Sequence, residues 1–166
     1  ILSSIIAVAL AFLSSFNKYL DSFVSWLIDV FLSIPHLLLI ILISIALGGG
    51  AFGVLVGVAF THWTSLARVL RAEIKRIKTS EFVTISEKLG QSKLWIARKQ
   101  ILPLVITQII VGTILIFPHA IMHEAGVTFL GFGLSPHEPA IGIILSESMK
   151  YLATGNWWLA LFPGLA

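Results

Sequence analysis

Residues 101–122 read ILPLVITQIIVGTILIFPHAIM, a run without a single charged side chain. An α-helix rises about 1.5 Å per residue, so a run of this length crosses the roughly 30 Å hydrocarbon core of a bilayer. The rest of the chain has the same character: 57% of its 166 residues are hydrophobic and only 11% are charged. With a mean hydropathy of +0.99, a water-soluble fold would lack the polar surface to cover it. We therefore expect an all-α, polytopic transmembrane helical bundle and exclude a soluble enzyme, a nucleic-acid-binding domain and a disordered chain.

Further apolar segments flank this run and predict a single membrane domain over 1–166. Because the first and last segments begin or end inside an apolar stretch, we expect a fragment truncated at both ends. Pro35 lies inside the second segment, and Trp157 and Trp158 are typical of an interfacial aromatic belt. The approximate predicted spans are 1–16, 23–47, 51–67, 101–122 and 158–166.

Most of the positive charges of the chain lie in one window, residues 68–99, which contains only three acidic residues. A basic loop between apolar segments stays on the cytoplasmic side of the membrane. We therefore expect 68–99 to be a cytoplasmic loop and 135–156 to be an external segment. The basic loop either only orients the protein or also docks a cytoplasmic partner. Nine of the 11 Lys and Arg residues lie in the window: Arg68, Arg71, Lys75, Arg76, Lys78, Lys88, Lys93, Arg98 and Lys99.

A short amphipathic helix is predicted inside this window, over 81–89. Ser80 is expected to cap it, and Gly90 ends it as glycine does at a helix C-terminus. Its apolar residues Phe82, Ile85 and Leu89 recur at helical spacing, which leaves one apolar face for a protein groove to bury. We also expect Asp29, in the second span, to pair with a polar group across the bundle. Several glycines are expected to allow close helix approach: Gly112, Gly126, Gly131, Gly133 and Gly142.

The segment SEFVTISEKLG (80–90), followed by Leu102-Pro103, resembles the cytoplasmic signature loop of ABC-importer permeases. In that family a Glu-Ala-Ala element, a glycine and a Leu-Pro pair follow one another, and the loop helix inserts into the ATP-hydrolysing subunit. The glycine and the Leu-Pro pair match, whereas the Glu-Ala-Ala positions hold Thr-Ile-Ser here. The resemblance implies coupling to the ATPase through Glu81, Phe82, Ile85, Ser86, Glu87, Leu89 and Gly90.

Two further strings, EAGVTFLGFGL (124–134) and LALFPGLA (159–166), resemble the C-type subunits of dipeptide, oligopeptide and nickel permeases. The resemblance implies the type I ABC-importer permease fold and half of a translocation pathway in the bacterial cytoplasmic (inner) membrane. It implies several partners: a second permease subunit, two ATP-binding subunits, an extracytoplasmic substrate-binding protein and membrane lipid. ATP and Mg²⁺ would bind the partner subunits, and this chain would bind no cofactor or nucleic acid of its own.

Two histidines raise the question of what is transported. His119 and His123 stand four residues apart, so on a helix they share one face and can offer nitrogens to a transition metal. Glu124 follows directly, and an ionisable residue at membrane depth faces a cavity or a partner. The alternative is that both histidines hydrogen-bond within the bundle or lie at its outer interface. Nickel-permease subunits resemble this chain at the His-x-x-x-His segment, which implies nickel or a related metal, free or chelated, as cargo touched by His119, His123 and Glu124.

Two alternatives to metal import follow. The same architecture imports dipeptides or oligopeptides in other members of the family. A membrane-embedded metalloprotease is a function of another class, because His123-Glu124 begins the His-Glu-x-x-His zinc motif. The position where the second histidine of that motif belongs holds Val127, so we expect a non-catalytic transport subunit.

Overall fold

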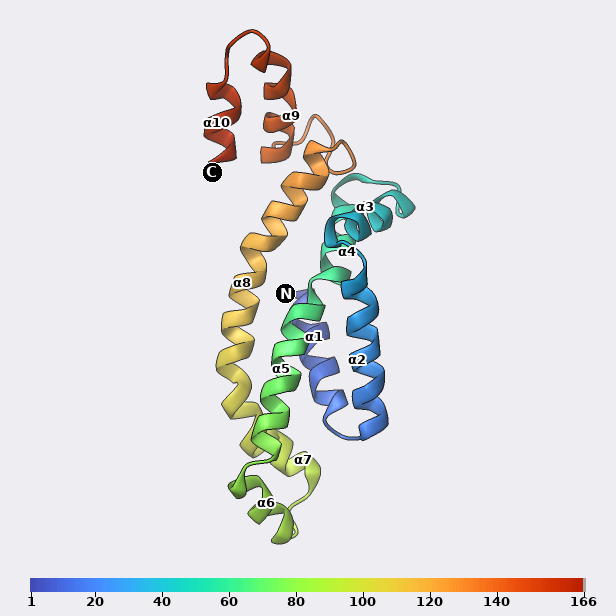
Figure 1. The fold of residues 1–166 in the computed structure, drawn as a ribbon, viewed down its shortest axis with the longest axis vertical. Coiled ribbons are helices and arrows are strands. Elements are labelled where there is room, and N and C mark those ends of the chain that lie inside the picture. Colours follow the sequence, from blue (N-terminus) through green and yellow to red (C-terminus); the bar gives the residue numbers. More distant parts are fainter. Residues whose placement is uncertain (166) are drawn as a thin grey trace. The chain divides into compact units, whose positions relative to one another are not determined.

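The computed structural model describes residues 1–165, and within them it contains helices and no strand, which confirms the all-α prediction. These helices divide into two compact units. The first combines residues 1–33 with 62–116, and the second combines 34–61 with the described residues from 117 onward. Figure 1 shows the order of the helices along the chain.

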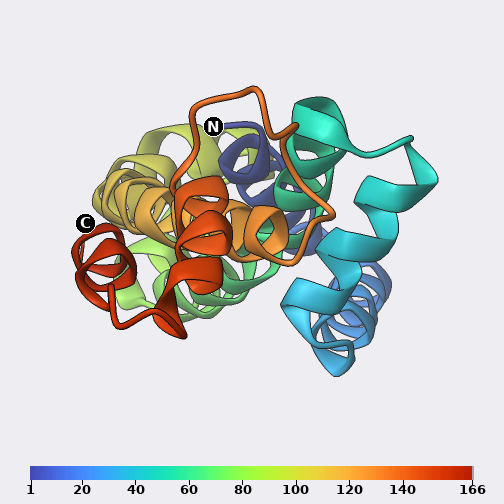
Figure 2. The same ribbon diagram turned by 90° about the horizontal axis from the view of Figure 1, so that it is seen from above.

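The first unit packs around the contact between α1 (Leu2–Ser14) and α5 (Trp63–Lys78). Small residues of α1, Ala7 and Ala11, are fully buried in one apolar cluster with Leu70 of α5. Figure 2 looks at the same helices from above. The other elements of the unit are α2 (Lys18–Ser33), α6 (Glu81–Lys88), α7 (Lys93–Ile96), the π-helical turn η1 (Ala97–Ile101) and the first part of α8 (Leu102–Phe129).

The second unit contains a close pair of antiparallel helices, α3 (His36–Ala46) and α4 (Gly50–Thr61). A Cβ atom at Gly53 would lie 2.8 Å from the Ser44 carbonyl oxygen, and one at Gly57 would lie 3.0 Å from the side chain of Ile40. This Gly-x-x-x-Gly pair therefore lets the two backbones approach as small residues do between membrane helices. The rest of the unit is the end of α8 with α9 (Ile141–Leu152) and α10 (Trp158–Gly164).

Two continuous helical stretches, Gly50–Lys78 and Lys93–Phe129, are long and apolar enough to cross a membrane. A third stretch reaches this length only if α2 and α3 count as one broken span. The predicted span 23–47 is therefore not one straight helix, because the chain leaves helical geometry at Ile34 and Pro35. Proline lacks the N–H that would continue the ladder, and it disfavours helical geometry in the residue before it.

The predicted loop 68–99 is mostly helical. α5 continues to Lys78, and helical backbone resumes at Lys93, so irregular backbone is confined to short joints around α6. α8 extends the expected 101–122 segment to Phe129, passing through Pro118. The segment 135–156 is also partly helical, since it includes α9.

One glycine in the set expected at close helix contacts has a different role. A Cβ atom at Gly131 would meet no heavy atom within 4 Å, and the φ of this residue is +85°. Its N–H donates to Thr128 O and the next N–H, of Phe132, donates to Val127 O, which closes the C-terminus of α8. Gly142 fits the expectation, because a Cβ there would collide with the Ala125 carbonyl oxygen.

Candidate functional site

The short amphipathic helix predicted over 81–89 is present as α6 (Glu81–Lys88), and the structure shows what ends it. Gly90 has a φ of +83°, its N–H donates to Glu87 O at 3.0 Å, and the following Gln91 N–H donates to Ser86 O at 3.1 Å. This pair of bonds is the Schellman arrangement, for which a residue without a Cβ is best suited. The expected side-chain cap from Ser80 is wrong, because its hydroxyl donates to Ile77 O at 2.5 Å, at the end of α5.

The two faces of α6 have different surroundings. Val83 is completely buried in the apolar cluster of the first unit and fixes the helix to it. Phe82, Ile85 and Leu89 are 45%, 56% and 76% exposed. Large apolar side chains this exposed on so short a helix form a surface suited to a protein groove. The predicted apolar face is thus separate from the residue that anchors the helix.

Polar residues of α6 fix its position and border its apolar face. The Ser86 hydroxyl donates to Phe82 O at 3.0 Å and accepts a 2.6 Å hydrogen bond from Gln100 Nε2, which ties α6 to the π-helical turn η1. Glu81 and Glu87 are exposed and form no ion pair within residues 1–165. Both carboxylates are therefore accessible to cations on a partner.

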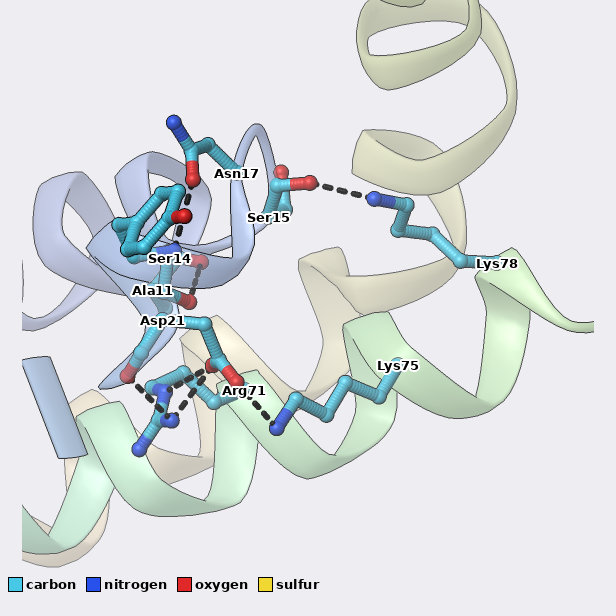
Figure 3. A network of polar contacts seen from close by, with 9 residues as sticks. Ala11, Ser14, Ser15, Asn17, Asp21, Arg71, Lys75 and Lys78 are labelled. Carbon is cyan, nitrogen blue, oxygen red and sulfur yellow. Dashed lines mark hydrogen bonds and ion pairs between the residues drawn. The ribbon is translucent and has the colours of Figure 1, made fainter.

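A half-buried carboxylate, that of Asp21, connects the start of α2 to α5, which sequence reasoning did not foresee. Asp21 Oδ1 accepts from Arg71 Nη2 at 2.5 Å and from Arg71 Nε at 3.2 Å, and Arg71 Nη2 also donates to the Asp21 carbonyl oxygen at 3.0 Å. Lys75 Nζ lies 2.7 Å from the other carboxylate oxygen, Oδ2 (Figure 3). Arg71 has a side chain only 9% exposed, so this pair is largely shielded from solvent.

Two further contacts extend this set along α5. Arg68 Nη2 lies 2.8 Å from Asp29 Oδ1, as expected for a carboxylate that pairs across the bundle. Lys78 donates to the carbonyl oxygen of Ser15, between α1 and α2 (Figure 3). Four cations on α5 are therefore held by groups from the α1–α2 region. We call the set Arg68, Arg71, Lys75 and Lys78 with Asp29, Asp21 and Ser15 the α5 polar ladder.

The histidines proposed as metal ligands lie in the second unit. His123 Nδ1 is 2.8 Å from the carbonyl oxygen of His119, so one ring nitrogen faces the backbone of its own helix. The ring of His36, on α3, lies 5.9 Å centroid to centroid from that of His123, and His36 Nε2 is 3.1 Å from Thr61 O. Sequence reasoning missed this neighbour, since 87 positions separate the two residues.

The third predicted pathway residue, Glu124, takes part in ending α8. Its Oε1 accepts a 2.8 Å hydrogen bond from the Thr128 hydroxyl, whose oxygen accepts the Leu134 N–H at 3.1 Å. Within residues 1–165, no group of three or more His, Cys, Asp or Glu side chains is placed to hold a metal ion. The metal role of His119, His123 and Glu124 therefore stays a prediction.

An apolar groove of about 600 Å³ lies between α8, α9 and α10 in the second unit. Met122 and Phe129 of α8, Leu145 and Met149 of α9, and Pro163 of α10 are among its lining residues. Methionine side chains adapt to irregular apolar partners. The groove is thus a surface for apolar groups and offers no carboxylate or imidazole to a metal ion.

Residues 3–166 match the protein family described as "Binding-protein-dependent transport system inner membrane component". The match covers nearly the whole chain, including α6 and the histidine segment. It agrees with the type I ABC-importer permease fold that the sequence predicts, and the stretches long enough to cross a membrane agree with a membrane location.

Individual relatives of the chain are named as peptide transport permeases. The chain is 32% identical to the dipeptide transport permease DppC of Bacillus subtilis over 87% of its length, and 29% identical to the oligopeptide permease OppC of that organism over 86%. A putative peptide transport permease of Brucella suis is 29% identical over the whole chain. The chain covers 45%, 47% and 56% of these proteins, so it spans about half of their length.

These names bear on the alternatives left open by the sequence. All three relatives are named as transport permeases, in agreement with a non-catalytic transport component and not with a membrane metalloprotease. They are named for dipeptide, oligopeptide or peptide transport, and none of the three is named for nickel. The comparisons therefore favour the peptide alternative over nickel, and the particular closeness to nickel permeases is not supported.

Proposed function

This chain belongs to the family of binding-protein-dependent transport system inner membrane components, and from that premise we propose that it is part of a permease subunit that imports short peptides. The family match supports the importer class, and the names of the relatives support the substrate. The protein would lie in the bacterial inner membrane with α6 in the cytosol. It would work with a second permease, two ATP-binding subunits and an extracytoplasmic peptide-binding protein.

The exposed apolar face of α6 is the observation that carries the mechanism. Val83 fixes one side of the helix to the first unit, while Phe82 and Ile85 project where a groove can receive them. The bond from Gln100 to Ser86 joins α6 to the start of the α8 segment. A displacement of α6 by an ATP-binding subunit would therefore reach a membrane-crossing helix directly. This chain would transmit motion and perform no hydrolysis itself, and a rocking of helices would open the pathway to one side at a time.

The test uses the full-length permease assembled with its partner subunits and reconstituted in vesicles. Ile85→Asp places a charge in the apolar face of α6, and we expect peptide uptake to fall at least about tenfold because a buried unpaired carboxylate costs several kcal/mol. ATP-driven uptake of a radiolabelled dipeptide measures the effect. Basal ATP hydrolysis, measured in parallel, separates lost coupling from a lost ATPase.

Gln91→Asp is the matched control, since it adds the same charge directly after α6, at an exposed position outside both the apolar face and the Glu-Ala-Ala positions. It should leave uptake within about twofold of the parent. Normal uptake by the Ile85→Asp protein would exclude α6 as the coupling element.

A double variant, His119→Ala with His123→Ala, tests the substrate. We expect it to import dipeptide as the parent does. Metal import would be favoured instead if the parent imported nickel and no dipeptide, and if the double variant lost the nickel uptake.

A further inference from the structure

The basic window contains a second group of cations that the α5 polar ladder does not use. Lys88, Lys93, Arg98 and Lys99 are all exposed, and within residues 1–165 none of them forms an ion pair. Glu87 directly precedes Lys88, but no Asp or Glu occurs between Lys88 and His123, so Lys93, Arg98 and Lys99 have no acidic neighbour in the sequence. These three residues therefore carry uncompensated positive charge.

The backbone places most of this charge on one face together with apolar side chains. Ile96 and Ile101 are buried in the core of the first unit, which fixes the inner face of α7 and η1. On the outer face lie Leu94, which is 60% exposed, and Trp95, which is 41% exposed. Arg98 follows Leu94 by four positions and Lys99 follows Trp95 by four, so each of these cations lies next to an apolar side chain on that face. We call Lys93, Leu94, Trp95, Arg98 and Lys99 the basic-aromatic face.

This face adjoins the apolar surface of α8. Leu102, Leu104 and Ile106 are 37%, 49% and 49% exposed, and they follow Lys99 within two turns of helix. The stretch from Lys93 onward is one of the two long enough to cross a membrane. Tryptophan and Lys or Arg immediately outside an apolar span are typical of the level of lipid headgroups.

We propose that the basic-aromatic face is a binding site for an anionic phospholipid. Lys93, Arg98 and Lys99 bind the headgroup phosphate, with the Arg98 guanidinium able to donate two parallel hydrogen bonds to it. Trp95 and Leu94 lie one turn further from the apolar span than Arg98 and Lys99, beside the headgroup. A lipid fits better than an acidic protein surface because the cations lie next to exposed apolar side chains and because the face leads directly into the membrane-crossing stretch.

The experiment uses the full-length permease, assembled with its partner subunits, in nanodiscs of phosphatidylcholine to which brominated phosphatidylglycerol is added. Bromine quenches tryptophan fluorescence on contact, and the signal lost in Trp95→Phe isolates the contribution of Trp95. We expect saturable quenching by brominated phosphatidylglycerol and little quenching by the same amount of brominated phosphatidylcholine. The triple change Lys93→Gln, Arg98→Gln and Lys99→Gln should weaken the apparent affinity for phosphatidylglycerol about tenfold or more.

A matched triple variant removes the same number of charges elsewhere: Lys18→Gln, Arg76→Gln and Lys150→Gln, all at exposed positions. It should bind phosphatidylglycerol as the parent does. Equal quenching of Trp95 by the two brominated lipids would overturn the proposal, since the contact would then be with bilayer in general. Selectivity that appears only when the ATP-binding subunits are present would also overturn it, because the cations would then serve a protein interface.

Discussion

The two halves of the basic window carry similar charge and use it differently. Along α5, Arg68, Arg71, Lys75 and Lys78 are held by the α1–α2 region, and Arg71 is almost entirely shielded. From Lys88 to Lys99, the cations make no ion pair within the described chain and remain exposed. A count of charges cannot separate the two halves, because the acids that neutralise the first come from distant positions in the sequence. The first half stabilises the fold, and the second is available to partners.

The largest effect on stability is expected from the buried end of the α5 polar ladder. Asp21→Ala would leave Arg71 shielded without its counter-ion, and we expect the free energy of unfolding to fall by roughly 3 kcal/mol. Denaturant titration of the purified full-length permease in micelles measures the change. A loss below about 1 kcal/mol would mean that the shielded pair is no more important than a surface one.

An intermediate effect is expected when the charge is kept and the shape is changed. Arg71→Lys retains the cation but cannot reach the carboxylate and the carbonyl oxygen of Asp21 together, so we expect a loss of about 1–2 kcal/mol. The same titration measures it. Stability equal to that of the parent would show that charge alone holds α2 to α5.

The α5 polar ladder also contains an exposed ion pair, Asp29 with Arg68, which can be compared with the shielded pair Asp21 with Arg71. Asp29 and Arg68 have side chains 66% and 56% exposed, so solvent screens them, and Asp29→Ala should cost at most about 1 kcal/mol. Raising the salt concentration should shrink this difference further, while the Asp21→Ala effect persists. If salt reduces the loss of unfolding free energy equally in both variants, the Asp21–Arg71 pair is no better shielded from solvent than the Asp29–Arg68 pair.

The smallest effect is expected in the unpaired half of the window. Lys93→Gln, Arg98→Gln and Lys99→Gln together should change the free energy of unfolding by no more than about 0.5 kcal/mol in neutral micelles, since no intramolecular contact is lost. A loss comparable to that of Asp21→Ala would show that these cations support the fold after all.

Local signals made much of the fold predictable. The apolar runs predict helices, Gly90 marks the end of α6, and the spacing of Phe82, Ile85 and Leu89 predicts its exposed face. Each of these features depends on residues within a few positions of one another. The break at Pro35 also had a sequence signal, but a proline within an apolar run is compatible with either a kinked span or two separate helices.

Contacts between distant segments were not predictable in the same way. Asp21 and Arg71 are 50 positions apart, and nothing in either neighbourhood identifies the other. The close approach of α3 and α4 uses Gly53 and Gly57, whose Gly-x-x-x-Gly spacing was an available signal that the sequence predictions left out. The spacing of His119 and His123 predicts a shared helix face equally well for a metal pair and for a ring that contacts its own backbone, so it could not decide the cargo.

The π-helical turn Ala97–Ile101 determines how α7 is rotated about the helix axis relative to the start of α8. Such wide turns accommodate one extra residue within an otherwise regular helix. Removing one residue there would restore the tighter winding and leave Ile96 facing the core, because five residues of the wide turn cover about the same rotation as four residues of α-helix. Winding all five residues as ordinary α-helix would instead rotate α7 by roughly 100° about its axis and turn Ile96 out of the core. The wide winding of this turn therefore keeps Ile96 buried.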